Sequence, residues 1–382
     1  MRVKLRNPDR VEELAGSRTV AELLDELDLN PSTVLVIAGG ELVTAGTALD
    51  DDAEVEIRPV ISGGAGGPRC VVCRQPAVIE EPRHRSAWCG PHFVDHVQGQ
   101  IRKAIDQRLD GQRMFSYEDR ILVAVSGGKD SIALWDALID LGYRVDGLYV
   151  GLGIGGYSSR SQVICEEFAA RRAEPRGLRL HVVDLAEEYG YSTPSGSTAT
   201  GRAPCGVCGL SKRYVFNRVA VDHGYDVMVT GHNLDDEAAT LLGNVIRWQD
   251  DFLSRQRPVL PATGPNQVRK VKPLYRLSER EMAAYCVVRG IDYVVEECPL
   301  VDGNTGQELK EALNLLERTS PGIKAQFLFG FLDRHADTFA AERPGGDGAT
   351  VELRACDDCG MPTVGDVCAF CRQRDRILAV LP

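Results

Sequence analysis

The chain has 382 residues, of which 43% are hydrophobic and 26% charged, as in ordinary globular proteins with two or three domains. Its formal net charge of −11 argues against a sequence-independent nucleic-acid binder, although a local basic face is compatible with it. We find no apolar run near the ~18 residues of a membrane span and no secretory signal, so we expect a cytoplasmic protein. The 12 cysteines, mostly in Cys-x2-Cys pairs, indicate metal or redox chemistry rather than disulfides.

Residues 1–64 predict a separate small domain with the order strand, helix, strand, strand. The first strand is expected at Met1–Arg6, and Thr19 can cap the following helix through its side-chain oxygen. The last strand runs into Gly63-Gly64, and the segment is similar to the β-grasp sulfur carriers of the ThiS/MoaD kind. The resemblance implies a tail that carries sulfur as a thiocarboxylate.

The Gly-Gly pair is not a free chain end, because Gly64 is joined to Ala65 and to a Gly-rich linker at residues 65–69. One hypothesis is that a protease cuts after Gly64 and releases the carrier. The other is that the domain stays fused as a docking or structural module on a flexible tether.

Residues 70–96 contain two paired sets of metal-ligand side chains. Cys70-x2-Cys73 is followed by Cys89-x2-His92, and thiolates with one imidazole suit a closed tetrahedral zinc site. A catalytic zinc keeps one position for water, so four protein ligands predict a structural ion.

The central segment, residues 97–342, begins with a strand, a glycine turn and a helix. The apolar run 121–125 precedes Ser-Gly-Gly-Lys-Asp-Ser at 126–131, and helical spacing follows from Ile132. Two glycines let the backbone approach a ligand, and the free N–H groups of the new helix favour phosphate. The turn resembles the PP-loop of ATP pyrophosphatases, and it lacks the spacing of a P-loop kinase or GTPase.

Strands and helices then alternate, which predicts an α/β fold with a doubly wound parallel sheet. Ligands in such sheets bind at the carboxyl ends of the strands, where both the 126–131 turn and Gly-His-Asn-Leu-Asp-Asp at 231–236 are expected. The Ser-, Gly- and Pro-rich stretch 192–204 between them predicts a mobile active-site loop.

Three cysteines near this edge have no fixed interpretation from spacing alone. Cys205 and Cys208 suit a redox disulfide pair or half of a zinc site, and with Cys298 they suit a [4Fe–4S] cluster with one open iron. Cys165 and Cys286 lie in helical apolar patterns and are expected to be core thiols.

Residues 343–382 begin with a Pro/Gly-rich linker and end in a second quartet of cysteines. Four thiolates at this spacing predict a zinc ribbon. Its ligands would be Cys356, Cys359, Cys368 and Cys371.

From about residue 70 to 371 the chain resembles the TtuA family of tRNA 2-thiouridine synthetases, which are TtcA-like PP-loop ATP pyrophosphatases. The motifs that carry the resemblance are the two metal quartets, 126–131, 152–158, 204–208, 230–237, 272–274 and 297–299. The related 2-thiocytidine enzymes share the PP-loop and central cysteines but lack the flanking zinc modules. In most relatives the sulfur carrier is a separate chain, so the fused N-terminal domain is a departure.

The resemblance implies a PP-loop fold of the adenine nucleotide alpha hydrolase kind, two structural zinc ions, and a [4Fe–4S] cluster on Cys205, Cys208 and Cys298. It implies catalytic roles for these cysteines, Lys212 and Asp236. It also implies ATP contacts from Ala124, Ser126, Gly127, Gly128, Asp130, Ser131, Val150, Lys212 and Gly231.

The expected reaction is ATP-dependent tRNA 2-thiolation: adenylation makes the uracil C2 oxygen a leaving group, and sulfide displaces AMP. Mg²⁺ would bridge the phosphates, and Asp130 or Asp236 could hold it. Expected partners are tRNA, an E1-like adenylyltransferase, a cysteine desulfurase or other sulfur donor, and a second copy of the chain. The residues offered as a tRNA face are Arg213, Arg247, Arg255, Arg257, Arg269, Lys270 and Lys272.

Two alternatives remain. Another PP-loop tRNA enzyme, of the 2-thiocytidine or lysidine type, is one, and the central cysteines disfavour the lysidine type. A sulfur carrier or RNA-binding module with a degenerate ATPase is the other, and the intact 126–131 motif disfavours it. The T-loop and the anticodon wobble uridine are both compatible substrates.

Overall fold

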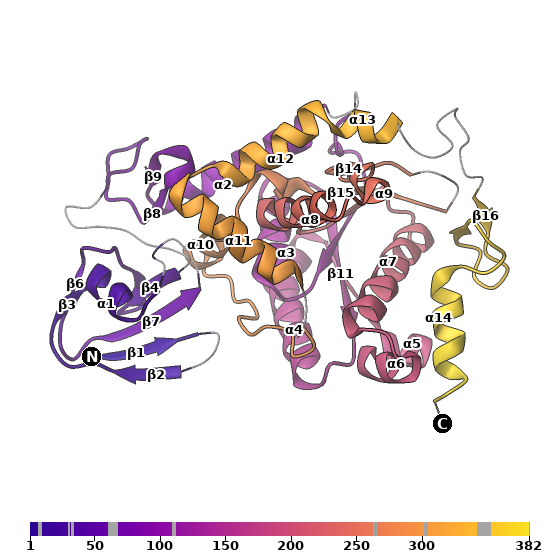
Figure 1. Ribbon diagram of the computed structural model, residues 1–382, viewed down its shortest axis with the longest axis horizontal. Coiled ribbons are helices and arrows are strands. Elements are labelled where there is room, and N and C mark those ends of the chain that lie inside the picture. Colours follow the sequence, from indigo (N-terminus) through magenta and orange to yellow (C-terminus); the bar gives the residue numbers. More distant parts are fainter. Residues whose placement is uncertain are drawn as a thin grey trace.

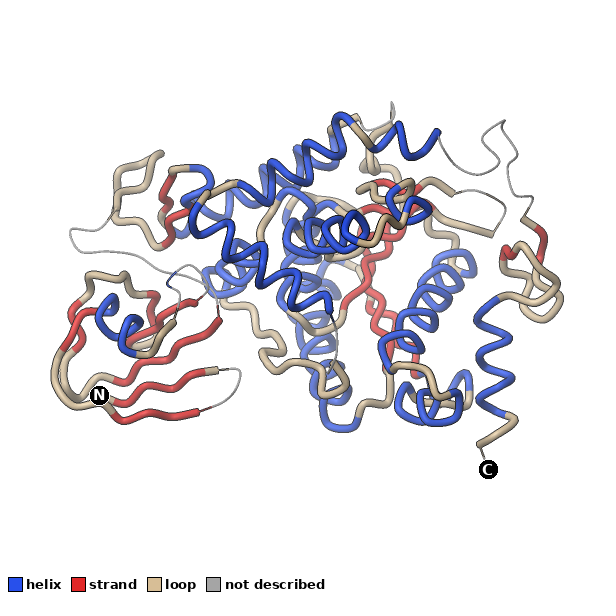
Figure 2. Tube along the Cα trace, viewed as in Figure 1, coloured by secondary structure: helices blue, strands red, loops and turns tan. Residues whose placement is uncertain are grey.

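The computed structural model describes residues 1–6, 10–29, 31, 34–59, 68–108, 112–262, 264, 266–301, 305–341 and 353–381. The predicted tail Gly63-Gly64 and the linker residues 343–352 lie outside these ranges. Figures 1 and 2 show a small N-terminal domain beside a large α/β body, with a C-terminal module at the far end.

The N-terminal domain is a five-stranded sheet in the order β2-β1-β7-β4-β5, covered on one face by helix α1. Alternation places Val3, Val36 and Ile57 on that inner face, where they are nearly fully buried. Thr19 and Glu22 form a capping box at the start of α1, which confirms the predicted cap. The elements are β1 (Arg2–Leu5), β2 (Arg10–Glu13), β3 (Arg18–Thr19), α1 (Val20–Glu26), β4 (Val34–Ala38), β5 (Glu41–Leu42), β6 (Ala48–Leu49) and β7 (Glu54–Pro59).

The N-terminal metal module is a short hairpin, β8 (Ile79–Glu81) and β9 (Ser86–Trp88), that leads into helix α2 (Gly90–Asp106). One stripe of α2, which includes Phe93, Val97 and Ile101, is fully buried in the main core. The module is therefore fixed to the α/β body through a continuous helix.

The central sheet has the order β12-β11-β10-β13-β15-β14, and four of its five pairings are parallel. This confirms the predicted doubly wound architecture, in which chain reversal on either side of β10 opens a crevice at the carboxyl edge. The strands are β10 (Ile121–Val125), β11 (Val145–Gly151), β12 (Leu180–Asp184), β13 (Val227–Val229), β14 (Val259–Leu260) and β15 (Arg269–Val271).

Helices cover both faces of this sheet (Figure 1). They are α3 (Lys129–Asp140), α4 (Gly155–Phe168), α5 (Leu185–Tyr189), α6 (Thr193–Thr200), α7 (Pro204–Asp222), α8 (Leu234–Ile246), α9 (Asp250–Leu253), α10 (Glu279–Arg289), α11 (Thr305–Thr319), α12 (Ile323–Arg334) and α13 (Ala336–Ala341).

The predicted mobile loop at residues 192–204 is wrong for most of its length. Residues 193–200 form helix α6 rather than a loop, because Ser192 and Ser195 cap each other reciprocally and Pro194 occupies its first turn. Helix α7 begins directly after this segment, at Pro204, so Cys205 and Cys208 lie on its first turns.

The C-terminal module consists of β16 (Arg354–Ala355), β17 (Pro362–Thr363) and helix α14 (Ala369–Leu378). Phe370 stacks on Tyr214 of α7 with ring centroids 3.7 Å apart, and Gln373 accepts a hydrogen bond from Arg202. The module therefore packs on the helix that carries Cys205 and Cys208. In the described part of the chain, no helix combines the length and apolarity needed to cross a membrane.

Candidate nucleotide and thiol site

A cavity of about 280 Å³ lies at the carboxyl edge of the central sheet. Eight of the nine residues predicted to bind ATP line it, and Gly127 lies within the same turn. Aromatic and polar residues that no motif assigned to ATP also line it, among them Tyr149, Phe216 and His232. The lining residues from the prediction are Ala124, Ser126, Gly128, Asp130, Ser131, Val150, Lys212 and Gly231.

The turn at 126–131 is held closed by its own side chains. The Ser126 N–H donates to Ser131 Oγ, and Ser131 Oγ donates to the Gly128 carbonyl, both at 3.0 Å. Gly127 has φ +78°, and a Cβ there would lie 2.9 Å from the Ser161 backbone, so only glycine fits. The N-terminus of α3 therefore presents free N–H groups to the cavity, as a phosphate site requires.

Beside this turn, three carboxylates and two ammonium groups alternate in a chain of ion pairs. Lys129 Nζ lies 3.2 Å from Asp130 and 2.6 Å from Glu279. Lys310 Nζ lies 3.4 Å from Glu279 and 2.6 Å from Asp236. The chain of charges thus joins the two sequence motifs through α10 and α11.

Asn233 closes this chain into a ring. Its Nδ2 donates to Asp130 at 3.0 Å, and its backbone N–H donates to Asp236 at 3.1 Å. We call the six residues the polar ring: Lys129, Asp130, Asn233, Asp236, Glu279 and Lys310. Asn233 also caps α8 and is fully buried, so the ring is built on rigid elements.

Charge in the polar ring is unevenly shared. Burial raises the pKa of Glu279, but the neighbouring Lys129 and Lys310 outweigh this effect and lower the pKa to about 2. Burial raises the pKa of Asp130 to about 6 against the opposing Lys129, and Glu279 and Asp236 add to the increase. Three carboxylates thus outnumber two ammonium groups, and Asp130 takes up a proton more readily than an ordinary aspartate.

Sequence reasoning missed Glu279 and Lys310. Glu279 is the first residue of α10, directly after the capping residue Ser278. Acidic residues are common in the first turn of a helix, and the capping pair Ser278–Glu281 is sufficient to explain this local sequence. Lys310 lies in a charged amphipathic helix where a lysine carries no signal. Only their approach to Asp236 in the fold identifies them.

Lys212 connects the nucleotide cavity to the predicted thiol group. It lines the cavity from α7, and its ammonium group interacts with the Cys208 thiol one helical turn earlier. Burial raises the pKa of Cys208, Lys212 acts against this, and Cys205 and Cys298 act with it. The three thiols therefore lie close enough to influence one another.

Cys298 reaches this place from a turn far along the chain. The Val301 N–H donates to the Cys298 carbonyl at 3.1 Å, and Cys205 Sγ lies 4.0 Å from the Leu300 carbonyl oxygen. The three sulfur atoms do not all lie within 4.8 Å of one another. Thiolates that share one zinc lie closer together, because each is only about 2.3 Å from the ion. Cys165 and Cys286 are fully buried core thiols, as predicted.

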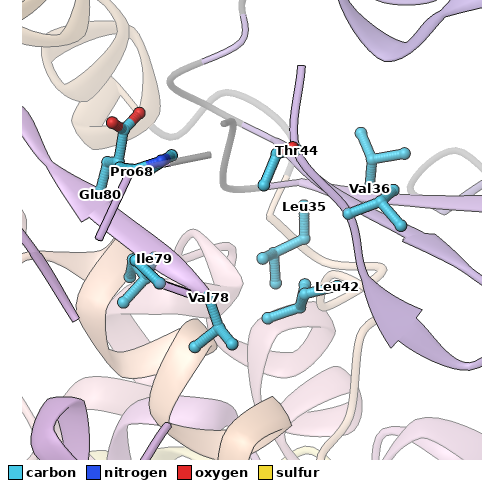
Figure 3. A pocket seen from close by; sticks show the side chains of 10 residues that line it. Leu35, Val36, Leu42, Thr44, Pro68, Val78, Ile79 and Glu80 are labelled. Carbon is cyan, nitrogen blue, oxygen red and sulfur yellow. The ribbon is translucent and has the colours of Figure 1, made fainter. Parts of the chain in front are cut away.

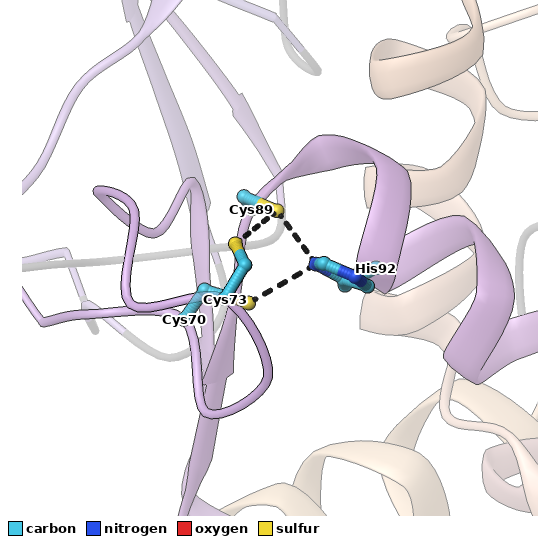
Figure 4. A group of neighbouring side chains, drawn as sticks. All are labelled: Cys70, Cys73, Cys89 and His92. Carbon is cyan, nitrogen blue, oxygen red and sulfur yellow. Dashed lines mark hydrogen bonds between the residues drawn. The ribbon is translucent and has the colours of Figure 1, made fainter.

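The N-terminal quartet has the compact geometry of a closed metal site (Figure 4). Cys89 Sγ lies 3.2 Å from His92 Nδ1 and 3.6 Å from Cys73 Sγ, while Cys70 Sγ lies 3.5 Å from the same imidazole nitrogen. These separations suit four ligands around one tetrahedral ion.

The C-terminal quartet is equally compact, since all four thiols lie within 4.8 Å of one another. The sulfur atoms of Cys359 and Cys368 are 3.8 Å apart. Both quartets therefore fit the predicted structural zinc ions. The residues brought together are Cys356, Cys359, Cys368 and Cys371.

Several basic residues of the predicted tRNA face are engaged within the fold. Lys272 pairs with buried Glu237 at 2.7 Å, and Arg257 pairs with Asp337 at 2.5 Å. Arg269 lies 3.6 Å from an aspartate in the loop before β10. These side chains stabilise the molecule, which weakens their assignment as free phosphate ligands.

Three family descriptions match successive parts of the chain. Residues 3–64 match the ThiS family, and residues 69–94 match the N-terminal LIM domain of the 2-thiouridine synthetase TtuA. Residues 95–302 match the PP-loop domain.

Proteins similar in sequence include "tRNA-5-methyluridine(54) 2-sulfurtransferase" of Thermus thermophilus, 49% identical over 81% of this chain and 91% of its own. The protein of the same name in Pyrococcus horikoshii is 40% identical over 80% of this chain and 93% of its own. Among solved structures, the U34-tRNA thiolase NcsA of Methanococcus maripaludis, described with its [4Fe-4S] cluster, matches with a TM-score of 0.63 and 21% identity. That match covers 80% of this chain and 95% of the thiolase, and at this identity it shows a shared fold.

Proposed function

Because this chain belongs to the TtuA family of PP-loop tRNA 2-thiouridine synthetases, we propose that it replaces the C2 oxygen of a tRNA uridine by sulfur in an ATP-dependent reaction. One observation carries the proposal: Lys212 lines the nucleotide cavity and also interacts with the Cys208 thiol. A single side chain thus joins the place where the base would be activated to the place from which sulfur would come. A lysidine-type enzyme has no use for such thiols.

ATP would bind with its phosphates on the 126–131 turn and at the N-terminus of α3. The N–H groups there, with Lys129 at their side, stabilise the negative charge that develops as pyrophosphate leaves. Adenylation of the uracil O2 forms an O–P bond and breaks the bond between the α- and β-phosphates. Attack by sulfide at C2 then expels AMP with that oxygen.

Mg²⁺ suits the polar ring, because hard oxygen ligands and excess negative charge favour that ion. Asp130 and Asp236 would hold the ion. Lys129 and Lys310 would interact with the phosphates. Lys212 would neutralise the α-phosphate or polarise the C2 oxygen. Because Lys212 interacts with the Cys208 thiol, its ammonium group would also lie beside the entering sulfur.

Cys205, Cys208 and Cys298 would hold a [4Fe–4S] cluster. Three ligands and wide sulfur spacing suit a cluster better than a closed zinc site. When bound, the cluster would supply an open iron that binds hydrosulfide. The chain's own part is to place these thiols beside the cavity and Lys212.

The substrate we favour is the T-loop uridine at position 54. Three relatives 39–49% identical to this chain are named for 5-methyluridine 54, whereas the NcsA relative of Haloferax volcanii is 29% identical. Sulfur would come through a thiocarboxylate carrier that an E1-like adenylyltransferase and a cysteine desulfurase charge. The two quartets would hold structural zinc, and the active form would be a cytoplasmic homodimer.

We retain the predicted division into five parts. Residues 1–64 form the carrier-like domain, 65–69 the linker, 70–96 the zinc knuckle and 97–342 the catalytic domain. Residues 343–382 supply the second linker and the ribbon. The Gly63-Gly64 tail would act as a sulfur carrier after cleavage.

The test compares Lys212→Ala with the wild type in a thiolation assay on unmodified tRNA, read by mass spectrometry of tRNA nucleosides. Loss of about 100-fold or more in rate is expected, because the residue acts where charge develops. Lys103→Ala, an equal change at an exposed site on α2, should leave the rate unchanged. Equal rates for Lys212→Ala and the wild type would refute the assigned role.

A further inference from the structure

One face of the N-terminal sheet is not part of that domain's own core. Leu35 alternates with the inward-facing Val34 and Val36 on β4, so its side chain points to the opposite face. It is nevertheless 0% exposed, and it belongs to the core cluster of the α/β body. A leucine on the outer face of a small domain is fully buried only when another part of the protein covers it.

The zinc knuckle provides that cover. Leu35 and Leu42 face Val78 and Ile79 of the knuckle across a cavity of about 10 Å³, which is room for one water at most (Figure 3). Leu42 lies beside Ile37 on the same outer face. The contact is therefore closely packed apolar surface, like the interior of a domain rather than a loose touch between tethered bodies.

A second contact lies on the neighbouring strand. Arg58 of β7 is directly opposite Leu35 in the sheet, and its side chain interacts with Tyr293 of the α/β body. The backbone N–H of the next residue, Val294, donates to the Gly127 carbonyl at 2.9 Å. The segment that the N-terminal domain touches thus rests on the nucleotide-binding turn and leads to Cys298.

We propose that the face formed by Leu35, Leu42 and Arg58 is a docking surface that seats the carrier-like domain on the zinc knuckle without need of the covalent tether. The domain would then stay bound after a cut between residues 60 and 67. Its role as a seat for a sulfur carrier rests on the proposed function, whereas the docking itself rests on the contacts above.

Docking of this kind changes what a cut would achieve. A carrier domain that is cut from the chain but stays docked remains beside the enzyme that uses it. The cut then frees only its C-terminal tail. The knuckle would then have two roles, zinc binding and carrier recognition. The side chains that carry recognition are Val78, just before β8, and Ile79, its first residue, not the metal ligands.

The experiment uses the full chain with a protease site placed within residues 60–67. After cutting, size-exclusion chromatography should show the two fragments eluting together. Leu35→Asp should weaken their association by roughly 10- to 100-fold, since a buried leucine is lost and a carboxylate is buried. Val11→Asp, which changes an exposed valine on β2 of the same sheet, should leave the fragments together.

Val78→Asp guards against misfolding of the N-terminal domain, because it attacks the same contact from the knuckle side. Release by both variants supports the docking surface. Separation of the unmutated fragments at micromolar concentration, or full retention in both variants, would overturn it. Thiolation is not the readout, so a failed activity assay leaves this result intact.

Discussion

Lys310 contacts Asp236 at 2.6 Å and Glu279 at 3.4 Å, and it comes from a helix that carries no recognised motif. Its side chain is only 21% exposed, so the pair is partly shielded from solvent. Removing one partner of such a pair leaves charge uncompensated where water cannot fully screen it. Lys310 is therefore a positioning residue for Asp236.

Lys310→Ala should lower the rate of ATP consumption by about 10-fold or more, because Asp236 and Glu279 would repel each other and the polar ring would open. Lys310→Arg should restore part of the rate by keeping the charge. Glu308→Ala, an exposed change on the same helix, is the matched control. Pyrophosphate release at saturating ATP is the measurement, and unchanged release in Lys310→Ala would rule out the role.

Replacement of Cys298 is the sharpest test of the three-thiol assignment. Cys298 is far from Cys205 in the sequence, and only the fold brings it near the other two thiols. Cys298→Ala, purified without oxygen, should lose bound iron and thiolation while keeping both zinc ions. Cys165→Ala removes an equally sized core thiol elsewhere and should keep its iron. Iron and zinc are measured by elemental analysis. A Cys298→Ala protein with a full complement of iron would contradict the three-ligand assignment.

At the scale of elements, each metal module is fixed to a functional helix. The ribbon helix α14 packs on α7, which carries Cys205, Cys208 and Lys212. The knuckle leads into α2 and contacts α10, where Arg83 donates to the fully buried Glu281 at 2.7 Å. A metal ion bound by either quartet would thus contribute to the active site indirectly, through the helix that its module contacts.

The contact between knuckle and α10 also contains a buried carboxyl group, that of Glu81. Glu81 is 6% exposed, and its Oε2 has no hydrogen-bond partner. Burial raises the pKa of Glu81 to about 7, with Glu281 adding to the shift and Arg280 opposing it. The folded protein therefore binds one more proton than the unfolded chain between about pH 4.5 and pH 7, so stability falls as pH rises through that window.

Glu81→Gln should remove this penalty and raise the free energy of unfolding by about 1–3 kcal/mol at pH 8. The gain should shrink as the pH is lowered toward 5, because the wild-type carboxyl group is then neutral. Denaturant unfolding of the zinc-loaded protein at several pH values measures both effects. Glu80→Gln, on the neighbouring and less buried position of β8, should show no such trend. A pH-independent difference would contradict the assignment.

At the scale of the whole molecule, a ThiS-family domain and a PP-loop enzyme of the tRNA 2-thiolation family are one chain. The N-terminal domain touches the segment that contacts the nucleotide-binding turn and leads to Cys298. A cleft of about 790 Å³ between the two bodies reaches Lys129 and Asp130. Fusion holds the ThiS-like domain at a high effective concentration beside this cleft.

A cut after Gly64 is the expected route to an active tail, because only a free carboxylate can be adenylated and thiolated. Intact-mass analysis of protein from its native host should then show a fragment that ends at Gly64. Part of this fragment should be heavier by the exchange of one oxygen for sulfur. Uncut chain alone under sulfur-replete growth, with normal thiolation in Gly64→Ala, would establish the domain as a permanent docking module instead.

The sequence by itself determined most of what depends on short-range pattern. The Gly-Gly turn between a buried strand and a helix, the capping box at Thr19 and both metal quartets lie within short stretches of chain, where spacing fixes geometry. The parallel sheet followed from the alternation of strands and helices, and it brought the 126–131 and 231–236 motifs to one edge. Helix α6 was missed because its reciprocal serine cap looks like loop composition.

Tertiary structure alone decided which distant charges and surfaces meet. Glu279 and Lys310 join the polar ring only because α10 and α11 pack beside α8, and no local pattern distinguishes them from solvated residues. Leu35 reads as an ordinary strand residue until the knuckle covers it. Such contacts depend on how rigid elements pack across the chain, and a charge or a methyl group has no preferred partner until that packing is complete.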